Sequence, residues 1–158
     1  YGFYRGGADN VMLMNVGTGT GTLVHELVHA LIRPDFPDVP HWFNEGLASL
    51  YEQCSLAGES IRGLPNWRLT GLQEAIRADT LRPLAEMIAD PRFRAAERVG
   101  INYAQARYLL MYLQDTGRLS DYYTAFRDNA AADPTGRKAL NRVLKVNESR
   151  PKGGAARG

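Results

Sequence analysis

A short polar group inside an otherwise apolar segment constrains this chain more than any other feature of its sequence. His25, Glu26 and His29 lie within residues 20–32, where the neighbouring side chains are mostly leucine, valine and isoleucine. Apolar positions cover nearly all faces of this segment at the helical period, so we expect a buried helix that the following prolines end. Two histidines and a glutamate are costly to bury in such a helix unless they bind a partner.

The spacing of the two histidines indicates the nature of that partner. Residues four apart on a helix share one face, so His25 and His29 can offer imidazole nitrogens to the same metal ion. Zinc suits two neutral imidazoles and one carboxylate, with a further position open to a water whose pKa falls to roughly 7. Glu26 points to the flank of that site, where it can accept a proton from the water and pass it to a leaving amine. The pattern therefore predicts a catalytic zinc site.

Three residues compete for the place of the third ligand. Glu45 lies near the start of the next predicted helix, which a short connection would bring antiparallel to the first. His41 is closer in sequence but belongs to the connecting loop. Asp35 stands where a compact class of zinc proteases places its third ligand after a glycine, but Ile32 occupies that glycine position and does not readily adopt a left-handed turn. We therefore favour Glu45.

Beyond the first helix the apolar periodicity is helical almost to the end of the chain. Helices are predicted over residues 42–57, 66–78, 83–89, 103–115, 120–131 and 135–146. Before the first helix, residues 1–16 are typical of two short strands, of which Val11–Met14 is the more convincing. We expect a mainly α (α+β) domain over residues 1–150 and a disordered tail over 151–158. Cys54, the only cysteine, is expected to be a small buried residue of the second helix.

A second motif supports the zinc hypothesis and resembles a known family. Residues 40–48 read Pro-His-Trp-Phe-Asn-Glu-Gly-Leu-Ala. Together with the His-Glu-x-x-His segment, this is similar to the gluzincins and specifically to the peptidase MA-like family. The resemblance implies a zincin-like helical domain whose small N-terminal strand unit lines the active-site cleft, with Glu45 as the third zinc ligand. Gly46 and Ala48 would let the two motif helices pack closely. Thermolysin-like members orient a zinc-binding histidine with an aspartate one turn later; here that position is Ser49, and Ser49 or Glu52 is the candidate substitute.

Residues 102–113 carry a further resemblance, to aminopeptidase-type gluzincins in which a tyrosine at a helix start donates to the oxyanion. By position that tyrosine is Tyr103, whose phenol is a suitable donor for developing negative charge. Asn102 and Gln105 have the character of a capping box, which would begin the helix there. The alternative is that Tyr103 only packs at the helix start.

Composition and charge exclude several other classes. A formal net charge of +2 is too small to imply a polyanionic partner, and the arginines at 92, 94 and 98 are interpreted as a solvated helix face or loop. We therefore expect no nucleic-acid partner. The apolar runs are too short to span a bilayer. The chain starts at Tyr1 without a charged-then-apolar leader, so we expect any signal peptide to have been removed already, and the resemblance favours an exported protein.

The sequence thus supports one main hypothesis and one alternative. The main hypothesis is a zinc metallopeptidase that acts on a peptide or protein with one zinc ion per chain. His25, His29 and Glu45 would bind the metal, while Glu26 and Tyr103 would be catalytic. The alternative is a non-catalytic module that zinc stabilises and that binds a partner. Glu26 favours the enzyme, because a purely structural zinc site does not require it.

Overall fold

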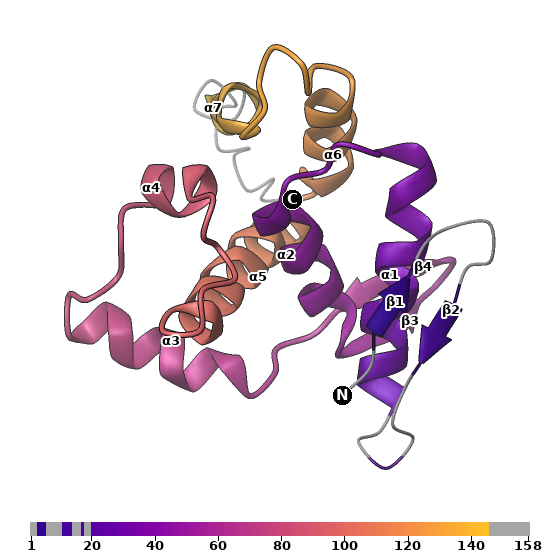
Figure 1. Cartoon of the computed structure of the whole chain (residues 1–158), viewed down its shortest axis with the longest axis horizontal. Coiled ribbons are helices and arrows are strands. Elements are labelled where there is room, and N and C mark those ends of the chain that lie inside the picture. Colours follow the sequence, from indigo (N-terminus) through magenta and orange to yellow (C-terminus); the bar gives the residue numbers. More distant parts are fainter. Residues whose placement is uncertain (1–2, 6–10, 14–16, 18–19, 146–158) are drawn as a thin grey trace, which may run out of the picture.

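A computed structural model describes residues 3–5, 11–13, 17 and 20–145 of the chain. These residues form seven helices and four short strands (Figure 1). In chain order the elements are β1 (Phe3–Arg5), β2 (Val11–Leu13), α1 (Thr20–Asp35), α2 (His41–Tyr51), β3 (Cys54–Ala57), β4 (Ser60–Gly63), α3 (Arg68–Arg77), α4 (Leu84–Ala89), α5 (Val99–Asp115), α6 (Leu119–Arg127) and α7 (Arg137–Lys145). The expected mainly helical class with a small strand unit is confirmed. The predicted tail over 151–158 lies outside the described residues.

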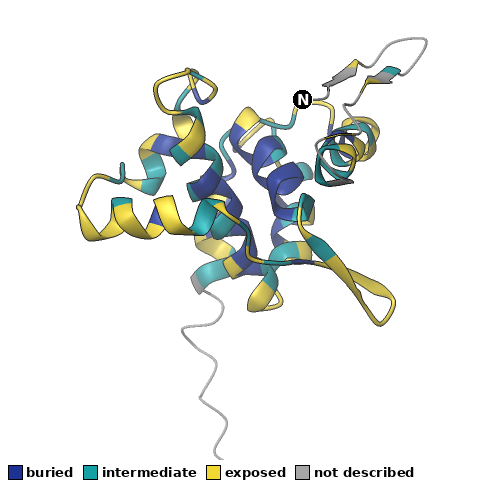
Figure 2. Ribbon diagram, turned by 90° about the horizontal axis from the view of Figure 1, so that it is seen from below, coloured by how far each residue is buried: buried dark blue, intermediate teal, exposed yellow. Residues whose placement is uncertain are grey.

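The core lies between α2 and α5 and continues toward α6. Helix α5 packs against α2, α3 and α6, and α2 also packs against α1 (Figure 1). Aromatic rings dominate the part nearest α6, where Phe43 contacts Phe36, Tyr122 and Phe126 with ring centroids 6.4, 5.5 and 5.3 Å away. Figure 2 shows the buried residues concentrated in these central helices. This core fixes the position of α2 and therefore of the residues on its other side.

The two strands expected before the first helix are present. β1 and β2 pair antiparallel, with Phe3 opposite Leu13 and Arg5 opposite Val11. β1 contacts α1, so the strand unit lies beside the helix that carries the two histidines. Met14, the last residue of the predicted strand Val11–Met14, lies outside the described residues.

Helix α1 differs from the prediction in its burial. Leu23, Leu27 and Leu31, which follow one another at four-residue intervals, are 37, 44 and 67% exposed. The described elements cover the side of α1 that faces α2, and this leucine row lies elsewhere on the helix. The expectation of a helix buried on all faces is therefore wrong for the described structure. Pro34 lies inside the last turn rather than ending the helix at residue 32.

The predicted helix over 42–57 is too long. Helix α2 ends at Tyr51, and the chain then forms a β3–β4 hairpin in which Ala57 pairs with Ser60 across a two-residue turn. Gly58 has a φ of 62°, a conformation that glycine adopts without steric cost and that such turns require. The apolar spacing of this segment fits a helix almost as well as a strand, whereas the Gly58 turn signal favours the hairpin.

The hairpin also changes the expectation for Cys54. The residue is partly buried and begins β3, so it is not a core residue of the second helix. Gly63 at the end of β4 approaches the end of α2 closely: a Cβ atom there would lie 2.5 Å from Leu50 Cδ1. A glycine is needed because the chain crosses back over α2 at this point.

The remaining helices agree with the prediction to within a few residues, with one consequential exception. Helix α5 begins at Val99, four residues before the predicted start. Tyr103 therefore lies in the second turn, and Asn102 is not a cap. Instead, the buried Asn102 amide donates to Phe93 O at 2.7 Å and accepts from Arg82 at 2.9 Å. Among the described residues no helix has the length and apolar character needed to cross a membrane.

Candidate metal centre

Helices α1 and α2 run antiparallel where they carry the predicted ligands. His29, late in α1, contacts Asn44 near the start of α2, whereas the earlier His25 contacts Glu52 just after α2 ends. The loop between the helices is short enough for α2 to return directly alongside α1, as expected from the prolines in it (Figure 1). This arrangement places Glu45 opposite both histidines.

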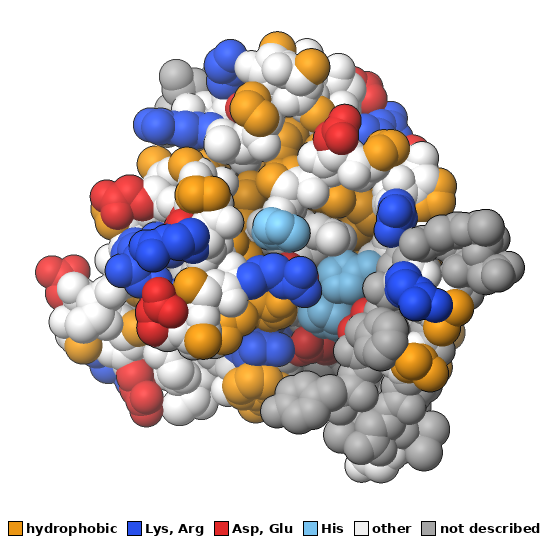
Figure 3. Space-filling model, viewed as in Figure 1, with side chains coloured by type: hydrophobic (Ala, Val, Ile, Leu, Met, Phe, Trp, Pro, Cys, Tyr) orange, Lys and Arg blue, Asp and Glu red, His pale blue; other side chains and the backbone are white. Residues whose placement is uncertain are grey.

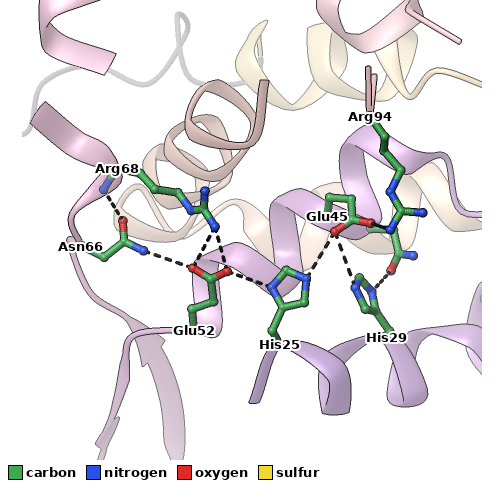
Figure 4. Close-up of polar contacts among 8 residues, drawn as sticks. His25, His29, Glu45, Glu52, Asn66, Arg68 and Arg94 are labelled. Atoms are coloured by element: carbon green, nitrogen blue, oxygen red, sulfur yellow. Dashed lines mark hydrogen bonds and ion pairs between the residues drawn. The ribbon is translucent and has the colours of Figure 1, made fainter. Parts of the chain in front are cut away.

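Three donor atoms converge between the helices. Glu45 Oε2 lies 3.3 Å from His25 Nε2 and 3.6 Å from His29 Nε2. The ligand atoms of these three residues all lie within 4.8 Å of one another, and Glu45 is only 2% exposed. Figure 4 shows both imidazoles pointing from α1 at the same carboxylate. Among the described residues, this group can hold a metal ion.

The other ring nitrogen of each histidine has its own partner. His25 Nδ1 donates to Glu52 Oε1 at 3.0 Å, and His29 Nδ1 donates to Asn44 Oδ1 at 2.9 Å (Figure 4). An N–H at Nδ1 leaves Nε2 as the nitrogen that can bind a metal, and the hydrogen bond fixes the ring orientation. The two contacts therefore orient both Nε2 atoms toward the point that they share with Glu45.

Glu52 belongs to a small polar network behind His25. Arg68 donates to Glu52 Oε1 at 3.1 Å, and the Asn66 amide donates to Glu52 Oε2 at 3.4 Å. Of the two residues weighed as orienting groups for a histidine, the structure places Glu52 in that position. Ser49 is fully buried and its hydroxyl has no hydrogen-bond partner. Glu52 follows Glu45 by two helical turns, whereas Ser49 follows it by one.

The close contacts between unlike charges shift the titration of this group. Burial lowers the pKa of His25, but hydrogen bonds to Glu45 and Glu52 outweigh burial and raise the pKa to about 9. Burial raises the pKa of Glu45, while His25, Tyr103, His29 and Arg94 lower it to about 2. The carboxylate is thus held ionised. A divalent cation bound between these residues would replace the proton of His25 as the positive charge that stabilises the Glu45 carboxylate.

Arg94 and Tyr103 close the site from the side of α5. Arg94 lies in the connection between α4 and α5 and forms an ion pair with Glu45 Oε1 at 2.9 Å, on the other oxygen from the histidines. Tyr103 lies close enough to Glu45 and Arg94 to influence their pKa values, and its ring stacks on that of Phe93 with centroids 5.7 Å apart. Burial and the Glu45 charge raise the pKa of Tyr103, so the phenol keeps its proton. Arg94 is therefore not simply the solvated arginine that its sequence context indicated.

Glu26 lies in the same cleft as the metal-binding group. It is 8% exposed and lines the cleft together with both histidines, Glu45 and Tyr103. Its negative charge helps to raise the pKa of Arg94, which places the carboxylate near that guanidinium. A carboxylate beside a metal-binding group is placed to exchange protons with a molecule bound in the cleft.

The cleft is large and open. Its volume is about 1230 Å³, and its lining comes from α1, α2, the segment around Asn66 and the start of α5. Figure 3 shows histidine side chains in a hollow at the centre of this face, with basic side chains beside them. None of the described residues of β1 or β2 is among those that line it. A cleft of this size is larger than most small-molecule pockets.

The rival third ligands lie apart from the donor atoms. Asp35 accepts from Tyr123 at 2.7 Å and from Arg127 at 3.0 Å on the surface of α6. His41 lines the cleft but is exposed and does not join the group of donors.

Gly46 packs against α5 rather than α1, because a Cβ there would lie 2.9 Å from Leu110 Cδ1. The expectation that this glycine brings the two motif helices together is therefore wrong.

Comparison with known proteins does not identify a family for this chain. No protein-family model, curated protein sequence or solved structure matches the chain significantly. The metal-capable group therefore rests on the arrangement of the chain's own residues, and the gluzincin resemblance stays a prediction.

Proposed function

We propose that this chain is a zinc-dependent metallopeptidase. The observation that carries the proposal is the convergence of His25 Nε2, His29 Nε2 and Glu45 Oε2, with Glu26 in the same cleft. Two imidazoles and one carboxylate are a ligand set that catalytic zinc sites use, and they leave a coordination position free.

The surroundings of the donor atoms fit a bound cation. Each histidine has an acceptor at Nδ1, which is how proteins orient imidazoles toward zinc. The donor set is nitrogen and oxygen without sulfur, which suits zinc in a hydrolytic role. When bound, zinc would supply Lewis-acid activation of a water nucleophile and of the substrate carbonyl.

Two side chains of the cleft would then carry out the proton transfers and stabilise charge. Glu26 would accept a proton from the water as its oxygen attacks the carbonyl carbon, and deliver it to the amine nitrogen as the C–N bond breaks. Tyr103 would donate its hydroxyl proton in a hydrogen bond to the oxyanion. The retained phenol proton and the place of Tyr103 in the cleft support this role. For this, its hydroxyl must turn from Glu45 toward the substrate.

The family resemblance supports the same function. The chain resembles the gluzincins in both motifs, and Glu45 of the second motif lies opposite the histidines of the first, as a gluzincin-like fold would require. A peptide or protein substrate follows from the proposed reaction. An exported location stays a prediction.

The test is a comparison of metal content and activity in two variants. We expect about one zinc per chain by elemental analysis. Glu26→Gln should retain the metal and lose cleavage of a broad peptide library, with kcat/KM lower by about 10²–10⁴-fold because the proton acceptor is gone. The matched control is Glu74→Gln on α3, an exposed position outside the cleft, which should cleave like the wild type.

The same measurements distinguish the enzyme from the non-catalytic module. Stoichiometric zinc without cleavage in the wild-type chain would favour the module. No zinc after loading would contradict both, and cleavage that persists in Glu26→Gln would show that another residue is the proton acceptor.

A further inference from the structure

Not all of the charged side chains that line the cleft form ion pairs with described residues. Three arginines and three glutamates line it. Arg68 pairs with Glu52, and Arg94 pairs with Glu45. Arg33 has no carboxylate within ion-pair distance among the described residues, and it is exposed. A positive charge in the cleft is thus left without a counter-charge from the described chain.

A bound metal makes the imbalance larger. The formal charges of the three arginines and three glutamates cancel when the histidines are neutral, so a divalent cation leaves two positive charges in excess. A cleft with one sign of charge and protein walls concentrates the field and attracts groups of the opposite charge. The excess positive charge therefore favours ligands that carry an anionic group.

The excess lies at one end of the cleft. Arg33 follows His29 by four residues, which places it one helical turn further along the same face of α1, roughly 6 Å along the axis. Arg94 comes in on the His29 side of the site, whereas Arg68 lies on the His25 side (Figure 4). His41, at the start of α2, also lines the cleft and is exposed.

Arg94 retains donors for a ligand although it pairs with Glu45. Its side chain is 58% exposed, and its one ion pair among the described residues is with Glu45. A guanidinium has five N–H donors in a planar fork that matches a carboxylate. Arg33 on α1 and Arg94 before α5 both line the cleft, so each can offer such a fork to a ligand there.

We infer that the His29 end of the cleft is a subsite for a carboxylate group of the substrate, with Arg33 and Arg94 as its specificity-determining residues. This inference rests on the proposed peptidase function. The substrate class is a peptide with a carboxylate within one or two residues of the cleaved bond. That carboxylate belongs either to an aspartate or glutamate side chain or to a free C-terminus.

Matched peptides test the subsite. One pair places glutamate or glutamine at the same position next to the cleaved bond, and a second pair carries a free or an amidated C-terminus. We expect the wild type to prefer one acidic member by about three- to tenfold in kcat/KM, as for a partly exposed charge-assisted contact. In Arg33→Gln this ratio should fall toward one. The pair that shows the preference identifies the source of the carboxylate.

The control is Arg77→Gln, which removes the same charge from an exposed position on α3 outside the cleft. It should keep the wild-type ratio. Equal cleavage of both members in both pairs, or a preference that Arg33→Gln leaves intact, would overturn the subsite while the peptidase proposal stands.

Measurements of peptide binding test the carboxylate subsite independently of the peptidase proposal. Zinc-loaded Glu26→Gln and the double variant Glu26→Gln/Arg33→Gln are titrated with the same fluorescently labelled peptides. Tighter binding of an acidic peptide that the Arg33 substitution removes would support the subsite even if no peptide is cleaved, in which case only the peptidase proposal fails. Equal affinity for acidic and amide peptides would overturn the subsite.

Discussion

On one side of α2, Trp42 and Phe43 are packed among aromatic rings of α6 and of the segment just after α1, while on the other side Asn44 and Glu45 face two histidines. The first side needs no charge and no ligand. The second side consists of hydrogen bonds between polar and charged side chains, and it includes the buried carboxylate of Glu45. Four consecutive residues of one helix thus serve two environments.

The difference separates stability from binding. Apolar packing contributes free energy in proportion to the area removed from water, whatever the cleft contains. Buried ionised side chains must be paired, so their net contribution to stability is small, whereas the arrangement of His25, His29 and Glu45 could hold a metal ion. Substitutions on the aromatic side should therefore change unfolding, and those on the polar side should change metal affinity.

The largest effect on stability is expected for Phe43→Ala. Phe43 is fully buried, and removing its ring leaves a cavity among Phe36, Tyr122 and Phe126. The free energy of unfolding should fall by about 3–5 kcal/mol, measured by urea denaturation of the metal-free protein. Phe43→Leu, which keeps most of the volume, should lose less. If the folded alanine variant no longer binds zinc, the two sides of α2 are not independent.

On the polar side of α2, Glu52→Gln is expected to change the free energy of zinc binding, by less than Phe43→Ala changes the free energy of unfolding. His25 Nδ1 would lose its charged acceptor, so the imidazole would be less firmly oriented and less basic toward the metal. Zinc affinity should fall by about 10–100-fold in competition with a chromophoric chelator. Glu59→Gln, in the exposed turn of the β3–β4 hairpin, is the matched control and should keep wild-type affinity. Unchanged affinity in Glu52→Gln would mean that the Glu52 contact does not support the site.

The smallest effect is expected for Asp35→Asn, at a residue that the sequence offered as a ligand. Hydrogen bonds from Tyr123 and Arg127 hold the pKa of Asp35 below its ordinary value of 3.8. A depressed pKa in the folded state stabilises the protein above the ordinary value, and this stabilisation is lost as the pH falls through the folded-state pKa. The variant should melt slightly below the wild type at pH 7, and the two should converge well below pH 3.8.

Asp38→Asn, at an exposed position in the loop that follows α1, is the control in the same melting experiment on metal-free protein. It should melt like the wild type at pH 7. Zinc content of Asp35→Asn should equal that of the wild type. Loss of zinc from this variant would contradict the assignment of Glu45 as the third donor.

Much of the helical framework could be predicted from apolar periodicity and proline positions. The failures occur where the local pattern fits two structures. Residues 54–57 have spacing that fits a helix, yet they form a strand because Gly58 allows a tight turn and Gly63 lets the chain cross Leu50. The early start of α5 was missed because Asn102 has the character of a cap, and its actual partners are distant in sequence.

The same limit applies to the site. Glu52, Arg94 and Arg33 are ordinary charged residues in the sequence, and none belongs to a motif that predicted the role proposed here for it. Glu52 was considered only as a substitute for a family position, and Arg94 was interpreted as solvated. Their contacts join residues that are 27 and 49 positions apart, so only the packing of α2 against α1 and α5 brings them together.

The sequence by itself determined that His25, Glu26 and His29 share one helix, because a four-residue spacing has a fixed meaning in helical geometry. It also contained Glu45 in a motif that a resemblance could identify. The tertiary structure decided which carboxylate meets the histidines, which partners hold their Nδ1 atoms, and where uncompensated positive charge remains in the cleft. Helical geometry is local and can be read from spacing, whereas the convergence of charged groups depends on how the aromatic core sets one helix against another.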